Sequence, residues 1–208
     1  MEAAAVGPRP PRPGLGGKKT IVSERAAAMV AAGGEVWVAD ETTLRELPPL
    51  RAAWSPRGVQ AVVVVSGRNA RRVLHGALNT RTGELVRTVT TTSKTADVVE
   101  AVTALGAVRP GVPKLLIWDN APPHQPKLVR AAAAAARIDL AFLPFRSPEL
   151  MPLEDLWRGL KGEVAANRAY ATMEDLVARA LAALDAPSRD ERRRRAGLTS
   201  SKFHWLPT

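Results

Sequence analysis

The chain of 208 residues contains no cysteine. Disulfide bonds and thiolate metal sites are therefore excluded, which suits a reducing cytoplasm. No run of 18 apolar residues occurs, so we expect no membrane-spanning helix. The basic, Pro- and Gly-rich residues 1–19 lack the apolar core of a signal peptide. The glycines form no phosphate-binding loop, and we expect no small-molecule cofactor. A cytoplasmic location fits these absences.

Acidic residues are the scarcer of the two charge classes. The chain has 30 Lys and Arg against 20 Asp and Glu, which gives a net charge of +10. Such an excess attracts a polyanion through counterion release, and it favours a nucleic-acid partner. The alternative is a GC-rich genome, which raises the Arg and Ala content whatever the function. The hydrophobic content of 46% supports a folded chain, with a length that suits one domain.

Composition divides the chain into three parts. Residues 1–20 read as a flexible basic leader, residues 21–186 as the folded domain, and residues 187–208 as a basic C-terminal tail. The run from Arg192 to Arg195 is typical of a solvated face or a disordered tail, and it can also add phosphate contacts.

Hydrophobic periodicity predicts an α/β fold. Strands are expected at 36–39, 58–65, 73–79, 84–91, 115–118 and 139–143. The β-branched run at 58–65 is the strongest strand signal, and we expect it to open an antiparallel meander. Helices are expected at 21–32, 93–106, 125–137, from Pro152 to Val164, and at 172–184. Trp54, Trp118 and Trp157 are expected in the core.

Three carboxylates follow apolar runs or begin a helix. Asp40 ends EVWVAD, Asp119 follows the run KLLIW, and Glu154 falls in the first turn of the helix that starts at Pro152. Carboxylate oxygens suit a hard divalent cation, so the pattern predicts a metal site at one edge of a sheet. In the alternative interpretation, an Asp at a strand end caps a turn, and Glu154 makes an ordinary surface pair with Arg158. Glu149 could substitute for Glu154.

The motifs around these acids carry a family resemblance. DNAPPH at 119–124, LPFRSPELMPLEDLWRGLK at 143–161 and ADETTLRELPPLRAAWSPRG at 39–58 resemble bacterial insertion-sequence transposases related to mariner. These are DDE-type enzymes with a ribonuclease-H-like catalytic domain. The resemblance covers roughly residues 35–184, and the 34 residues between Asp119 and Glu154 are typical of this branch. Met151 departs from the pattern, because the family usually has Asn before the proline.

The resemblance implies a fold, a reaction and a metal. The fold would be a mixed five-stranded sheet, with an antiparallel meander followed by parallel strands, flanked by helices. The reaction would be DNA cleavage at element ends and transfer of the 3′-hydroxyl into target DNA. Two Mg²⁺ or Mn²⁺ ions would serve it, with Asp40 bridging both ions and Asp119 and Glu154 each holding one.

Further residues and partners follow from the same resemblance. Asn120 and His124 lie close to Asp119 in sequence, and we expect them to support it from a second shell rather than to ligate metal. Arg158 and Lys161 share a helix face with Glu154 and are candidate DNA contacts. DNA is the expected partner, with a possible homodimer on paired ends, in a bacterial, nucleoid-associated setting.

Two alternatives remain open. Only about 34 residues precede the first strand, so we expect the family's N-terminal helix-turn-helix part to be missing. An inactive remnant that only binds DNA or oligomerises is the main alternative. A ribonuclease-H-type nuclease acting on RNA–DNA hybrids is a weaker one, since its motifs would differ around the second and third acids.

Overall fold

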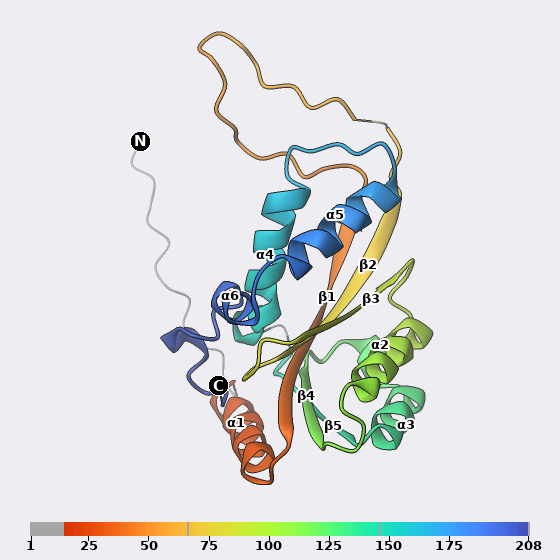
Figure 1. Ribbon diagram of the computed structural model, residues 1–208, viewed down its shortest axis with the longest axis vertical. Helices are drawn as coiled ribbons and strands as arrows, with labels where there is room; N and C mark the ends of the chain where they lie inside the picture. The colour runs from red at the N-terminus through yellow and green to blue at the C-terminus, as the bar shows by residue number, and fades with distance from the viewer. Residues whose placement is uncertain (1–14, 66, 146, 208) are drawn as a thin grey trace.

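A five-stranded sheet with helices on both faces organises the protein (Figure 1). The computed structural model describes residues 15–65, 67–145 and 147–207, so the first 14 residues of the expected leader lie outside it. The elements in chain order are α1 (Leu15–Ala31), β1 (Glu35–Arg45), β2 (Arg71–Asn79), β3 (Leu85–Thr90), α2 (Thr95–Ala107), β4 (Lys114–Trp118), η1 (Pro122–His124), α3 (Lys127–Ala135), β5 (Ile138–Phe142), η2 (Pro148–Leu150), α4 (Pro152–Val164), α5 (Met173–Asp185), α6 (Arg189–Arg195) and η3 (Ser201–Phe203).

The sheet has the order β3-β2-β1-β4-β5. The pairs β1–β2 and β2–β3 are antiparallel, whereas β1–β4 and β4–β5 are parallel. The expected mixed sheet, a meander followed by parallel strands, is therefore confirmed. In this arrangement β1 lies at the junction of the two halves, with an antiparallel neighbour on one side and a parallel neighbour on the other.

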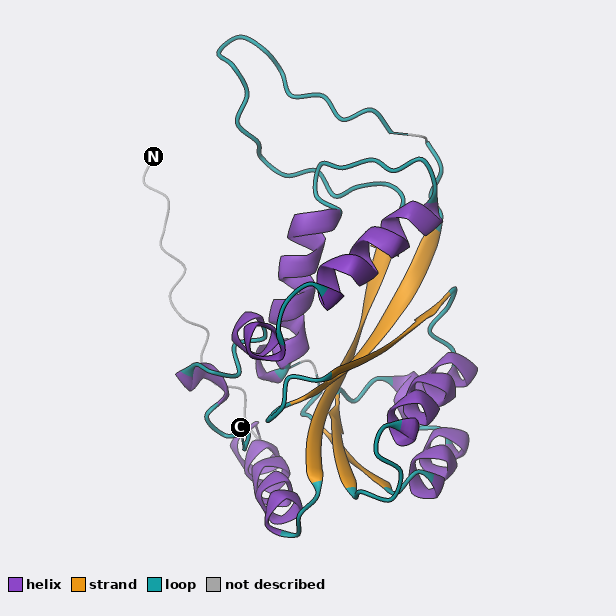
Figure 2. Cartoon of the chain, in the orientation of Figure 1, coloured by secondary structure: helices purple, strands orange, loops and turns teal. Residues whose placement is uncertain are grey.

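The first strand of the meander is not the predicted one. The run at 58–65 is not a strand; it belongs to a long loop that projects from the sheet between β1 and β2 (Figure 2). A β-branched run becomes a strand only where a partner is free, and β2 is already paired with β1 and β3. Strand β1 takes the predicted place instead. It continues to Arg45, because Thr42 and Leu44 alternate inward beyond the predicted end at Asp40.

Two apolar layers enclose the sheet. On one face, α1, α4 and α5 contact the strands and cover the layer that contains Val38 and Ile117. On the other face, α2 and α3 cover the layer that contains Trp37, Ala39 and Trp118. Alternate residues of β1 therefore serve opposite layers, as the pleat of a strand requires.

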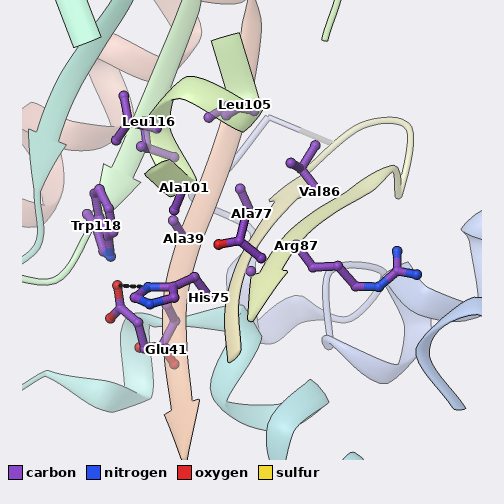
Figure 3. Close-up of a pocket in the computed structure, with 14 residues that line it drawn as sticks. Ala39, Glu41, His75, Ala77, Val86, Arg87, Ala101, Leu105, Leu116 and Trp118 are labelled. Carbon is purple, nitrogen blue, oxygen red and sulfur yellow. Dashed lines mark hydrogen bonds and ion pairs between the residues drawn. The ribbon is translucent and has the colours of Figure 1, made fainter. Parts of the chain in front are cut away.

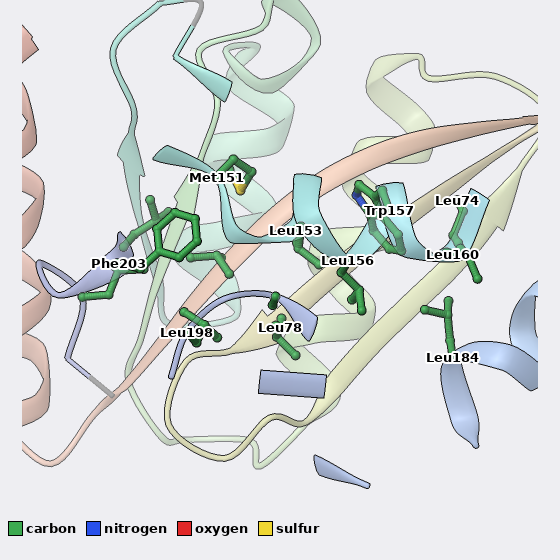
Figure 4. Packing of buried hydrophobic residues seen from close by; sticks show 14 of the residues in the cluster. Leu74, Leu78, Met151, Leu153, Leu156, Trp157, Leu160, Leu184, Leu198 and Phe203 are labelled. Atoms are coloured by element: carbon green, nitrogen blue, oxygen red, sulfur yellow. The ribbon is translucent and has the colours of Figure 1, made fainter. Parts of the chain in front are cut away.

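Helix α4 fits the sequence pattern closely. Pro152 occupies its first turn, where the missing amide hydrogen costs nothing. The predicted apolar face is buried, and Figure 4 shows it packed into the core. This face consists of Leu153, Leu156, Trp157, Leu160 and Val164. Trp157 lies so close to β2 that a Cβ on Gly76 would be 2.6 Å from its Cζ2 atom.

Several element ends differ from the prediction. Helix α1 starts at Leu15 rather than at Ile21, so the last residues of the expected leader are helical. Helix α2 starts at Thr95 rather than at residue 93, and the Asp97 side chain accepts a hydrogen bond from the amide of its N-cap residue, Lys94. Trp118 and Trp157 are buried as expected, but Trp54 is fully exposed on the projecting loop, so its core assignment is wrong.

The arginine-rich C-terminal segment is folded. Arg192 to Arg195 lie on α6, and Arg192 donates to the carbonyl oxygens of Gly83 at 2.7 Å and Leu184 at 3.1 Å. The residues that follow α6 join the core through Ala196, Leu198, Phe203, Trp205 and Leu206. The run is therefore neither a disordered tail nor a wholly solvated face. Within the described ranges, no helix is long and apolar enough to cross a membrane.

Candidate metal-binding site

Asp40 and Asp119 come from neighbouring parallel strands. The last recorded pair between β1 and β4 is Val38 with Ile117, and each Asp lies two residues further along its own chain. Asp40 stands within β1, opposite Gly76 of β2, whereas Asp119 directly follows the last residue of β4. Side chains at matching positions of parallel neighbours share a face, so the two carboxylates lie on the α4 side of the sheet.

Glu154 reaches the same place from α4. It is the third residue of the helix, and the contact of Trp157 with Gly76 one turn later holds this end of α4 against the sheet. All three acids line one open cavity of about 420 Å³. The other lining residues are Asn120, Ala121, Pro122, Leu143, Pro144, Phe145, Ser147, Pro148 and Met151.

Asp40 is the most perturbed group of the cavity. Burial, the adjacent Glu41 carboxylate and the Glu154 carboxylate raise the pKa of Asp40 to about 8. Its Oδ2 atom is buried and has no hydrogen-bond partner. A buried carboxylate oxygen without a donor, beside two further carboxylates, is an arrangement that a bound cation would stabilise. The residues present therefore fit a divalent metal ion.

The cavity is not a closed cage. Among the described residues, no group of three or more His, Asp or Glu side chains converges closely enough to coordinate an ion unaided. Mg²⁺ keeps several waters and is typically held by one or two carboxylates together with substrate phosphates. An open, incompletely assembled set of acids is compatible with that mode of binding.

His124 lies beside the site and is buried. Its Nδ1 atom is 2.7 Å from Asp119 Oδ1, its Nε2 atom is 3.0 Å from Glu41 Oε1, and its ring stacks on Trp118 at 4.0 Å. Burial alone would lower the pKa of His124, but the hydrogen bonds to Asp119 and Glu41 raise it to about 9. Both ring nitrogens face carboxylates, which only the imidazolium form satisfies.

Sequence reasoning did not assign Glu41 or His75. Glu41 Oε1 also faces His75 Nδ1 at 3.3 Å, and Figure 3 shows the pair beside the small pocket between the sheet and α2. Burial would raise the pKa of Glu41, but hydrogen bonds from His124 and His75 lower it to about 2. The position of Glu41 next to Asp40 was the available signal. Its partners are 34 and 83 residues away in sequence, so no local pattern indicated them.

The remaining predicted residues are arranged as follows. Asn120 lines the cavity, but its Oδ1 accepts from Gln125; Asp119 Oδ1 accepts instead from the Ala121 amide at 3.1 Å. Arg158 is exposed and pairs with Asp155 at 3.0 Å rather than with Glu154. Both Arg158 and Lys161 lie further along α4 than Glu154.

Lys161 and Glu149 do not line the three-acid cavity. Lys161 borders a hollow at the base of the projecting loop, together with Arg45, Leu47, Pro48 and Pro49. Glu149 is exposed in η2 and does not line the three-acid cavity, so its position does not favour it as a substitute for Glu154.

Comparison with known proteins identifies the family. A model described as DDE superfamily endonuclease matches residues 35–177. The chain belongs to this family. This DDE superfamily chain is 33% identical over 112 residues to an uncharacterized protein of Sinorhizobium fredii, covering 53% of the chain and 80% of that protein. It is 25% identical over 162 residues to an uncharacterized 39 kDa protein of insertion element IS630 from Shigella sonnei, covering 77% of the chain and 47% of that protein.

Solved structures support the same fold. The crystal structure of the Mos1 mariner transposase catalytic domain has a TM-score of 0.60 at 14% identity, covering 95% of this DDE superfamily chain and 94% of that chain. The Mos1 strand transfer complex has a TM-score of 0.68 at 14% identity, covering 99% and 63%. The ribonuclease-H-like fold is therefore confirmed. The chain spans less than two thirds of the Mos1 protein in that complex and about half of the IS630 protein.

Proposed function

We propose that the protein is the catalytic part of a transposase that cleaves DNA and transfers strands with divalent metal ions. The observation that carries the proposal is the unpaired, buried Asp40 oxygen beside Asp119 and Glu154 in one open cavity. Family membership supports this reading, because the matched model is that of an endonuclease. The structures of Mos1 paired-end complexes with Mg and with Mn support the choice of metal.

The proposed mechanism divides the work among the three acids. Two bound divalent ions would supply activation of the attacking oxygen and stabilisation of the leaving oxygen. Asp40, the most enclosed carboxylate, would contact both ions, whereas Asp119 and Glu154 would each hold one. The open side of the cavity leaves room for phosphate oxygens of the substrate. No nucleophilic side chain is required, because a water or a DNA hydroxyl attacks.

DNA is the proposed substrate. The net charge of +10 favours a polyanion, and the three acids are a local exception to it. Arg158 is 70% exposed one turn beyond Glu154, where it can exchange its pairing with Asp155 for a phosphate. Lys161 lies one further turn along α4 and is proposed to extend the same contact. A DNA strand would then run from the cavity along this helix.

The projecting loop between β1 and β2 is proposed to contact a second copy of the chain. Among the residues that the structure describes, seven of the ten exposed large hydrophobic side chains lie between residues 47 and 65. Trp54, Val62 and Val64 are at least 78% exposed, and a loop with so much apolar surface is typical of an interaction site. Paired-end complexes of Mos1, which is similar in fold, support a dimer on DNA.

Nicking of supercoiled plasmid tests the proposal. With Mg²⁺ or Mn²⁺ we expect nicking by the wild type and a loss of at least 100-fold in Glu154→Gln, because one metal-holding carboxylate is removed. Glu149→Gln is the matched control, since this exposed carboxylate lies outside the cavity. Equal nicking by the wild type and Glu154→Gln would contradict the assignment.

An inactive remnant is the second candidate function. Met151 favours it, because the residue that caps α4 has no side-chain hydrogen bond at the helix end that carries Glu154. A wild type that binds DNA but does not nick it with either metal would support the remnant. In that case Met151→Asn, which restores a capping side chain, is the variant in which activity should be sought.

A further inference from the structure

Glu41 connects three strands and the loop after a fourth. Its Oε1 atom faces His124 Nε2 at 3.0 Å and His75 Nδ1 at 3.3 Å. His75 comes from β2, and its Nε2 atom faces Thr90 Oγ1 of β3 at 3.0 Å. His124 comes from η1, which follows β4. One carboxylate of β1 is therefore tied directly to β2, through His75 to β3, and through His124 to the segment that carries Asp119.

The connection ends on Asp119. His124 Nδ1 is 2.7 Å from Asp119 Oδ1, and the Asp119 side chain is 50% exposed. An exposed carboxylate would otherwise rotate among several rotamers. The imidazole that holds it is fixed on two further sides, by stacking on Trp118 at 4.0 Å and by Glu41. Glu41 and Trp118 together therefore determine the direction in which His124 Nδ1 faces Asp119.

Glu41 is also adjacent to Asp40. Consecutive strand residues point to opposite faces, so Asp40 faces the α4 side of the sheet while Glu41 faces the α2 side. The path from Asp40 through the β1 backbone, Glu41 and the buried His124 to Asp119 is short. It therefore fixes the separation of the two carboxylates across the strand pair.

We propose that Glu41, acting through His124, is a positioning residue that holds the Asp119 carboxylate in register with Asp40. The inference rests on the proposed function, because its consequence is that Asp40 and Asp119 are placed to bind metal. Glu41 itself lies on the opposite face of the sheet and does not ligate the ion. Outer partners of metal ligands of this kind typically change metal affinity 10- to 100-fold when they are lost.

A double-mutant cycle tests the connection without metal or DNA. Glu41→Gln and Asp119→Asn do not share a direct contact, so independent residues would give additive effects on the unfolding equilibrium constant. We expect the effect of Glu41→Gln to be at least threefold smaller in the Asp119→Asn background, and the coupling to vanish when His124 is replaced by Phe. Additive effects of Glu41→Gln and Asp119→Asn in the protein that retains His124 would overturn the inference.

Binding of Mn²⁺ to the apoprotein, measured by electron paramagnetic resonance, gives the second readout. We expect Glu41→Gln to weaken binding about tenfold, while Glu100→Gln, an exposed carboxylate on α2, leaves binding unchanged. His124→Asn retains a donor for Asp119 but cannot reach Glu41, so it should also weaken binding. Wild-type affinity in His124→Asn would overturn the role of Glu41.

The two readouts separate this inference from the proposed function. A coupled cycle in a wild type that binds no Mn²⁺ would support the Glu41–His124–Asp119 connection and contradict the metal chemistry. A wild type that binds Mn²⁺ but gives an additive cycle would support the metal chemistry and contradict the Glu41–His124–Asp119 connection. In the nicking assay, Glu41→Gln should lower kcat with little change in KM for DNA, because DNA contacts on α4 are untouched.

Discussion

Trp157 of α4 lies directly against Gly76 of β2, and Gly76 is the residue paired with Asp40. A Cβ at this glycine would be 2.6 Å from Trp157 Cζ2, well inside van der Waals contact. The absence of a side chain at one position thus allows a helix to approach the sheet. That approach brings Glu154, one turn before Trp157, to the cavity that Asp40 lines.

Gly76→Ala should therefore destabilise the protein and displace Glu154. We expect a loss of about 2–3 kcal/mol in the free energy of unfolding, because the added methyl group forces the indole away. Urea denaturation monitored by tryptophan fluorescence measures this. Metal-dependent nicking should fall as well, since the α4 terminus moves away from Asp40.

Gly159→Ala is the matched control on the same helix. A Cβ there meets nothing within 4 Å, so the substitution should stabilise α4 by about 0.5–1 kcal/mol through its helix propensity. Equal effects of the two substitutions would show that the close contact at Gly76 does not determine the position of α4.

Asp40→Asn should stabilise the protein when no divalent metal is present. With a pKa of about 8, Asp40 is mostly protonated at pH 7 in the folded protein but ionised in the unfolded chain, so folding must bind a proton that Asn does not need. We expect a gain of about 1–3 kcal/mol at pH 7 in EDTA. The same variant should lose the increase in melting temperature that Mn²⁺ gives the wild type. If Asp40→Asn were less stable than the wild type in EDTA, the Asp40 carboxylate would have a favourable partner in the folded protein, and the prediction would be wrong.

Periodicity predicted the parts of the fold that depend on local sequence. Strands β4 and β5 and helices α4 and α5 follow the predicted pattern to within two residues, because each has a buried face of its own. The run at 58–65 has the strongest β-propensity but remains a loop, since a strand requires a partner. Pairing in the sheet is decided by the whole chain, which a local pattern does not describe.

The candidate site, like the fold, was predicted from the sequence only in part. Asp40, Asp119 and Glu154 line one cavity, as the sequence motifs indicated, and their role as metal ligands stays a prediction. The bonds from Glu41 to His75 and His124 could not be predicted, because they join segments that are distant in sequence and depend on strand register. Trp54 was placed in the core on residue type alone, without evidence that its loop had anything to pack against.

Arg109→Gln should make stability less dependent on pH in the acidic range. The guanidinium of Arg109 pairs with Glu35 at 2.6 Å and Glu84 at 2.7 Å. Burial would raise the pKa of Glu35, but the hydrogen bonds from Arg109 and Trp37 lower it below its usual value. A carboxylate with a lowered pKa contributes stability above its unfolded pKa, and loses that contribution as the pH falls through its folded pKa.

The expected loss in Arg109→Gln is about 1 kcal/mol at pH 7, since Arg109 is 39% exposed and its pairs are screened. The difference from the wild type should shrink as the pH falls below about 4.3, the ordinary pKa of Glu, and through the lower folded pKa of Glu35. Denaturation midpoints from pH 3 to pH 7 measure it, with the exposed Arg194→Gln as control. A difference that stays constant over this range would contradict the assigned partner.

Arg192 and Arg194 should respond differently to truncation, although they belong to one arginine run. Arg192 donates to the carbonyl oxygens of Gly83 and Leu184, so Arg192→Ala leaves two partly buried acceptors unpaired. We expect a loss of about 2 kcal/mol and faster proteolysis of the segment after α5, because α6 holds that segment against the β2–β3 turn. Arg194 is 64% exposed and pairs with Glu191, so Arg194→Ala should cost less than about 0.5 kcal/mol. Limited proteolysis and thermal unfolding of both variants distinguish a structural arginine from a solvated one. Equal stability of the two variants would mean that the run acts only as a charged surface.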